Sequence, residues 1–158
     1  MPKRIVASWL AVVVGCSTPA PPKDISQPGA VAWVVAHAES VRVYQPKVEM
    51  FGLVPASRSL EAVGPILNRE KVRLLRRLYQ QPCPSHYAPT MCACTPAAII
   101  RFSNRALSVE VTYCSDCGGS WVHGTGTAQA PRGDEGFSPC VLDSLAAFLR
   151  QEYPSLRG

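Results

Sequence analysis

Residues 97–113 read Ala-Ala-Ile-Ile-Arg-Phe-Ser-Asn-Arg-Ala-Leu-Ser-Val-Glu-Val-Thr-Tyr, and this stretch decides the fold. Apolar and polar side chains alternate on both sides of a central polar segment, which predicts two antiparallel strands joined by a turn. Pairing Phe102 with Leu107 sets one register for this hairpin. In that register Ile100 lies opposite Val109, and every apolar pair falls on one face. We therefore expect a hairpin whose apolar face is covered by the rest of the domain.

Two helices are expected to pack on this hairpin. The first spans about 68–80, where Asn68 is placed to cap a run with helical apolar spacing. The second spans about 138–152, with Ser138 as N-cap and Pro139 in the first turn. Further elements are a helix, or alternatively a buried strand, at 28–37, and strands at 41–44, 50–54 and around 121–123. The pattern predicts a small α+β domain with an antiparallel sheet.

Composition is consistent with one folded domain. Of the 158 residues, 47% are hydrophobic and 17% are charged, which is enough apolar material for a core of ordinary size. The formal net charge is only +5. Lys3 and Arg4 would leave with a signal peptide, so the remaining positive excess is too small to indicate a nucleic-acid partner.

The first 15 residues predict a signal peptide. The basic start, Met1–Arg4, precedes an apolar run of ten residues, Ile5–Val14. As a helix this run would span about 15 Å, half of a hydrocarbon core, which is too short for a transmembrane helix and typical of a signal peptide. Residues 16–28 are rich in proline and predict an extended spacer. A single cysteine-rich domain is then expected over 29–158.

The end of the apolar run, Val13-Val14-Gly15-Cys16, resembles the lipobox of bacterial lipoproteins. The resemblance implies cleavage before Cys16, diacylglycerol on its sulfur, and further acylation with a chain such as palmitate. It therefore implies a membrane-anchored protein of the cell envelope. Ser17 follows the cysteine and, by resemblance to enterobacterial sorting, implies the outer membrane of a Gram-negative cell. An ordinary secretory signal with a cysteine near its cleavage site is the alternative.

Once Cys16 is assigned to lipid, an even set of cysteines remains. Its members are Cys83, Cys92, Cys94, Cys114, Cys117 and Cys140. Outside the cytoplasm such cysteines usually pair, so we expect structural disulfides. If the other four cysteines pair among themselves, Cys83 and Cys140 would be the third pair by elimination.

The predicted hairpin register bears on the other four cysteines. With Phe102 opposite Leu107, Cys92 falls opposite Cys117 on the same face. Cys94 and Cys114 are diagonal neighbours that would need a bulge near Tyr113 in order to meet. Pro96 makes an irregularity there reasonable, since proline cannot donate a ladder hydrogen bond.

Two other thiol chemistries stay open. A tetrahedral zinc ion is the first, and its thiolate ligands would be Cys92, Cys94, Cys114 and Cys117, with His86 and His123 as substitutes. Redox catalysis through the C-x-x-C of Cys114 and Cys117 is the second. Gly118-Gly119 follows that motif, which disfavours the helix whose N-terminus usually activates such a thiol.

From about residue 29 onward, the order of motifs is similar to that of a loosely defined group of exported bacterial proteins of unknown function. The shared motifs include Cys94-Thr95-Pro96, Arg101-Phe102 and Cys114-x-x-Cys117. The resemblance implies that Cys94 pairs with one member of the C-x-x-C and that Cys83, Cys92 and Cys140 are additions. It implies no activity.

The expected function is that of a lipid-anchored, non-enzymatic envelope protein that binds or scaffolds a partner. No catalytic residues are assigned, because Trp121–Gly126 matches neither a nucleophile elbow nor a phosphate loop, and Asp134 and Glu135 fall on an expected loop. No cofactor is expected unless the cysteines bind zinc. The alternative is a thiol-based envelope protein, either a redox enzyme or a zinc binder.

The helix expected at 68–80 also has a strongly basic face. Its members are Arg69, Lys71, Arg73, Arg76 and Arg77. Such a face is compatible with acidic phospholipid or a negatively charged partner. Such a face is more often simply the solvated side of an amphipathic helix, and this is the interpretation that we favour from the sequence.

Overall fold

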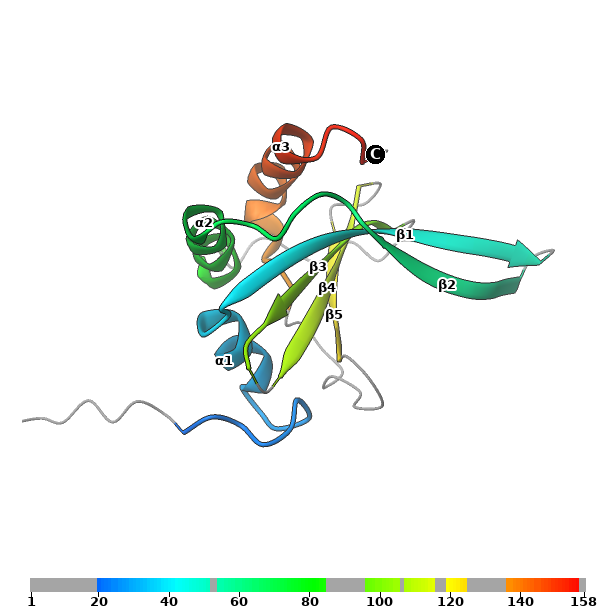
Figure 1. Ribbon diagram of the computed structural model, residues 1–158. Helices are drawn as coiled ribbons and strands as arrows, with labels where there is room; N and C mark the ends of the chain where they lie inside the picture. The colour runs from blue at the N-terminus through cyan, green and yellow to red at the C-terminus, as the bar shows by residue number, and fades with distance from the viewer. Residues whose placement is uncertain are drawn as a thin grey trace, which may run out of the picture.

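The computed structural model describes residues 20–51, 54–84, 96–105, 107–115, 119–124 and 136–156. Its centre is a five-stranded antiparallel sheet with strand order β2-β1-β3-β4-β5, and the helices lie on one side of it (Figure 1). The strands are β1 Ser40–Phe51, β2 Val54–Ala62, β3 Pro96–Ser103, β4 Ser108–Cys114 and β5 Gly119–Gly124. The helices are α1 Ala30–Ala36, α2 Arg69–Gln80, a 3-10 turn at Pro139–Val141 and α3 Leu142–Glu152. The predicted α+β class is confirmed.

The β3–β4 hairpin exists, but its predicted register is wrong. Phe102 pairs with Val109 rather than with Leu107, a shift of two residues. Leu107 is drawn into the turn, where its N–H donates to Asn104 Oδ1 at 2.9 Å and its carbonyl accepts from Asn104 N at 3.0 Å. Because side chains alternate with a period of two, the shift leaves the same residues on each face.

The core lies between the helices and one face of this sheet. Ile100, Phe102, Val109 and Val111 are completely buried there, as the alternation predicts. The Phe102 ring also lies 6.3 Å from that of Phe137, on the segment that leads into α3. The core is completed by Val31, Val34, Val35, Val41, Val43, Leu75 and Leu145, all fully buried. The helices thus pack on the apolar face of the β3–β4 hairpin.

The helix predictions hold with one correction. Residues 28–37 contain α1, so the helix and not the alternative buried strand forms. Asn68 caps α2 as expected, since its Oδ1 accepts from Lys71 N at 3.0 Å. At the last helix, by contrast, Ser138 forms no side-chain capping bond, and the chain passes through the 3-10 turn before α3 begins. Pro139 at the start of that turn favours this tighter entry.

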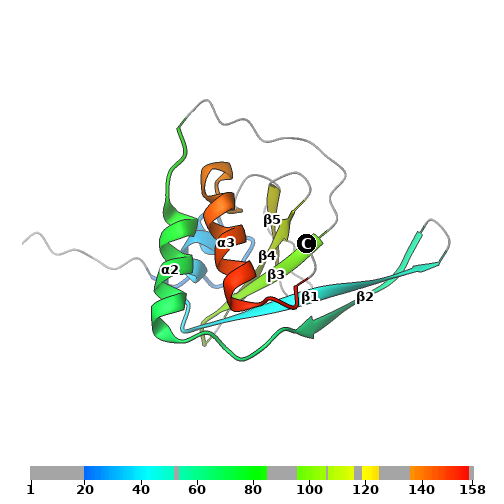
Figure 2. The same ribbon diagram turned by 90° about the horizontal axis from the view of Figure 1, so that it is seen from above.

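The second strand expected at 50–54 is wrong. Met50 and Phe51 end β1 and Val54 begins β2, and these two strands form a hairpin reaching away from the body of the domain (Figure 2). Beyond Tyr44, β1 pairs with β2 alone, so Pro46 lies inside the strand rather than bounding it. An edge position tolerates a residue without N–H because no neighbouring strand needs that donor.

The core also reaches into the segment that was assigned to the spacer. Ile25 is 3% exposed and belongs to the main apolar cluster. Around it the chain turns back, with Ser26 N donating to Asp24 Oδ1 at 3.0 Å and Lys23 N donating to Gln27 Oε1 at 3.1 Å. Part of the expected spacer therefore packs on the domain through Ile25.

Candidate functional site

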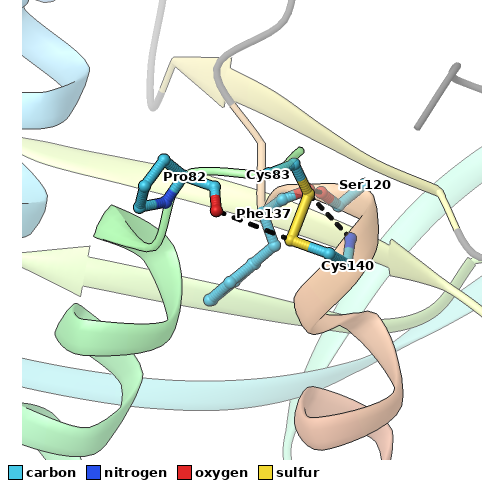
Figure 3. Close-up of a disulfide and its surroundings, with 5 residues drawn as sticks. All are labelled: Pro82, Cys83, Ser120, Phe137 and Cys140. Carbon is cyan, nitrogen blue, oxygen red and sulfur yellow. Dashed lines mark hydrogen bonds between the residues drawn. A yellow bond between two sulfur atoms is a disulfide. The ribbon is translucent and has the colours of Figure 1, made fainter. Parts of the chain in front are cut away.

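A disulfide joins Cys83 to Cys140, as expected by elimination (Figure 3). Cys83 follows the end of α2 and Cys140 lies in the 3-10 turn before α3, with a Cα–Cα distance of 5.7 Å. The backbone N–H of Cys140 donates to Cys83 Sγ at 2.9 Å, and the carbonyl oxygen of Pro82 lies 3.9 Å from Cys140 Sγ. This bond connects two helices across a sequence separation of 57 residues.

Cys114, at the end of β4, is also disulfide-bonded and is completely buried. Since Cys83 and Cys140 bond to each other, the partner of Cys114 lies outside the described residues. The register between β3 and β4 shifts between Pro96 and Ala98, so that Pro96 lies opposite Cys114. The irregularity that was expected near Tyr113 is therefore present at the base of the hairpin.

The other predicted cysteine sites lie outside the described residues. They are Cys16, Cys92, Cys94 and Cys117. The expected pairing of Cys92 with Cys117 rested on the register with Phe102 opposite Leu107, and that register is not the one formed. The pairing therefore loses its geometric support.

A metal site would have to draw on the same unplaced residues. Within the parts of the chain that the structure describes, no three His, Cys, Asp or Glu side chains are grouped so as to hold a metal ion. His86 and the side chain of His123 are not described. Cys114 is oxidised, and a disulfide sulfur does not offer the thiolate that zinc prefers. Zinc remains an alternative to be tested.

A hollow of about 370 Å³ lies between the base of the hairpin and α3. Its walls include Ala98 and Tyr113 from the sheet and Leu149 and Arg150 from α3. The lining is mostly apolar, and the exposed Arg150 supplies a positive charge beside it. Burial raises the pKa of the Tyr113 hydroxyl above 10.0, an effect that Arg150 opposes and Asp143 reinforces. The hollow is suited to an apolar group with an anionic or polar end.

Sequence patterns did not reveal this hollow. Its sheet residues and its α3 residues are about 35 to 50 positions apart in the chain. Each set reads as an ordinary core face by itself. Only the crossing of α3 over the hairpin base brings them together.

A polar cluster crosses the sheet face that points away from the helices. Arg101 Nε donates to Glu110 Oε1 at 2.9 Å, and Arg101 Nη1 donates to the Tyr44 hydroxyl at 3.1 Å. The guanidinium carbon lies 4.6 Å from the centre of the Tyr44 ring. These three side chains come from the neighbouring strands β1, β3 and β4. Their cross-strand contacts stabilise the sheet, which is a structural role.

Comparison with protein-family models, with curated proteins and with solved structures found no match. None of the helices in the described parts of the chain is both long enough and apolar enough to cross a membrane.

Proposed function

We propose that this protein is a lipid-anchored component of the cell envelope, a binding or structural module stapled by disulfides and tethered through Cys16. The observation that carries the proposal is the state of the described cysteines. Cys83, Cys114 and Cys140 are all in disulfides. Disulfides of this kind persist outside the cytoplasm, which is where a lipobox would direct the chain.

The binding role is supported by the hollow beside Tyr113. Its wall is built from a hairpin and a helix that the core holds in place, so it is a preformed surface. An apolar lining with one arginine at its edge suits the apolar side chain or acyl group of a partner.

Lipidation is tested by comparing the wild type with Cys16→Ala in a bacterial host fed labelled palmitate. The expected result is label and membrane fractionation for the wild type, and an unlabelled precursor for the variant. Ser17→Ala is the matched control, because it changes the neighbouring residue and leaves the acceptor sulfur intact. A Cys16→Ala protein that is labelled, processed and fractionated like the wild type would overturn the anchoring proposal.

The thiol-based alternative is tested on the purified mature protein. Under the proposal, titration with a thiol reagent after denaturation finds no free thiol, and metal analysis finds no zinc. One zinc per chain would favour the metal-binding alternative. A cysteine pair that is reduced by thioredoxin-like reductants without unfolding would favour the redox alternative.

A further inference from the structure

Four arginines form a continuous positive face on α2. We call Arg69, Arg73, Arg76 and Arg77 the arginine face. Their spacing of four, three and one residues places them on one side of a helix. Arg76 is half-buried and the other three are exposed.

The charge of this face is not neutralised by the rest of the described structure. Lys71, the remaining basic residue of α2, bonds to Glu152 of α3. None of the ion pairs formed among the described residues involves the arginine face. Glu70 is the only acidic residue of the helix and is exposed. The face therefore presents several uncompensated positive charges to the solvent.

The first described residues of the chain, 20–23, lie near the end of this helix. Residues 20–23, together with Trp33 and His37 of the α1 region and Gln80 at the end of α2, line one open hollow. Gln80 is three, four and seven residues beyond members of the arginine face, so it lies on the same side of α2. Figure 1 shows the N-terminal segment beside α1, at the end of the domain away from α3.

The length of the tether limits how far this surface lies from a membrane. Only three residues lie between Cys16 and Ala20. Fully extended, the four Cα–Cα steps from Cys16 to Ala20 reach at most about 14 Å, which is less than twice the Debye length of about 8 Å at physiological salt. A lipid on Cys16 would thus keep residues 20–23, which line a hollow with Gln80 at the end of α2, within about two Debye lengths of the phospholipid headgroups.

An aromatic residue accompanies the charges. Trp33 is half-buried in the same hollow, and its ring stacks on His37 with a centroid distance of 4.3 Å. Tryptophan is the side chain that most favours the boundary between lipid and water, because its large ring is apolar and its N–H is polar.

From this juxtaposition we infer that the arginine face of α2, with Trp33 beside it, rests on acidic phospholipid of the membrane that holds the anchor. The inference depends on the proposed lipidation of Cys16. It also defines how the anchored domain is oriented on the membrane. The helices α1 and α2 face the bilayer, and the sheet with its β1–β2 hairpin faces away from it. Each arginine near an anionic surface favours this orientation by about fivefold.

The experiment uses the mature lipidated protein in vesicles, with Trp121→Phe leaving Trp33 as its only tryptophan. Intact mass first establishes that the lipid is on the protein. Quenching of Trp33 by brominated lipids is then compared in phosphatidylcholine vesicles and in vesicles that also contain phosphatidylglycerol. We expect at least about twofold stronger quenching with phosphatidylglycerol, and loss of the difference at high salt, where screening is complete.

A charge-matched pair of variants locates the effect. Replacing Arg73 and Arg77 by Gln should remove most of the dependence on phosphatidylglycerol. Replacing Lys47 and Arg105 by Gln removes the same charge from exposed positions elsewhere and should preserve it. Thermal melts of both proteins check that they fold.

The outcomes separate this inference from the proposed function. A protein that carries no lipid at Cys16 overturns the anchoring proposal, and the inference with it. A lipidated wild-type protein whose Trp33 is quenched equally in both vesicles overturns the inference alone, and leaves an acidic protein as the partner for the arginine face. Equal loss of the effect in both charge variants would show attraction by net charge and also overturn it.

Discussion

The hydroxyl of Ser120 on β5 donates a hydrogen bond to the carbonyl oxygen of Phe137, 3.0 Å away, and so holds the entry to the last helix against the edge of the sheet. Phe137 is 3% exposed and packs its ring against Tyr79 of α2 at 5.4 Å. The contact links strand, helix and loop. It leaves almost no room for the neighbouring residue, Gly136, whose Cβ would lie 2.5 Å from the Ser120 carbonyl oxygen.

Replacing Gly136 by Ala should therefore destabilise the fold. The methyl group would overlap backbone atoms of β5, which cannot rotate away, and overpacking of this kind costs about 1 to 3 kcal/mol. The free energy of unfolding in urea measures the effect. Gly29→Ala is the comparison, because a Cβ there meets nothing within 4 Å and only the positive φ is strained. A Gly136→Ala protein as stable as the wild type would contradict the close approach.

Removing the Cys83–Cys140 disulfide should cost more than any single surface change. The bond closes a separation of 57 residues, and loop-entropy estimates for that length give about 4 kcal/mol. Replacing both cysteines by Ser leaves the other disulfides intact, so urea unfolding of this variant isolates the one bond. A loss below about 1 kcal/mol would mean that the bond does not constrain the unfolded chain.

Asn68→Ala should destabilise α2 by about 1 kcal/mol, since Lys71 N–H loses its acceptor. Asn68→Ser should retain most of the stability, because a hydroxyl also caps a helix. Thermal unfolding followed by circular dichroism compares the two variants. Equal stability of the Ala and Ser proteins would show that the cap contributes nothing here.

Tyr153 should make the fold sensitive to alkaline pH. Burial raises the pKa of its hydroxyl above 10.0, and the charge of Glu152 raises it further. The folded state therefore holds the proton more tightly than the unfolded chain. This contribution is fully present below pH 10 and is lost as the pH rises through the folded pKa.

Tyr153→Phe tests this dependence. The hydroxyl is buried without a hydrogen-bond partner in the described structure, so its removal should leave stability at neutral pH unchanged or slightly raised. The loss of stability between neutral pH and about pH 11 should be smaller than in the wild type. Parallel pH profiles for the two proteins, measured by urea unfolding, would exclude Tyr153 as a source of the alkaline loss.

The buried and exposed sides of the strands and helices could be predicted from the amino-acid sequence alone. Alternation in β3 and β4 identified which side chains are buried, and helical spacing with an Asn68 cap located α2. These features depend on neighbours within a few residues, so a local period is sufficient. The register could not be read in this way, because the bonds between Asn104 and Leu107 decide where the turn ends and either even register keeps the same faces.

The amino-acid pattern alone was sufficient to predict the α+β class and the buried faces of β3 and β4. Only the tertiary structure decided that β1 continues into a projecting hairpin, that a hollow forms under α3, and that residues 20–23 lie beside the end of α2. The reason is physical. Apolar periodicity records which side of an element avoids water, but contacts between distant elements depend on how their surfaces fit, and that information is spread over the whole chain.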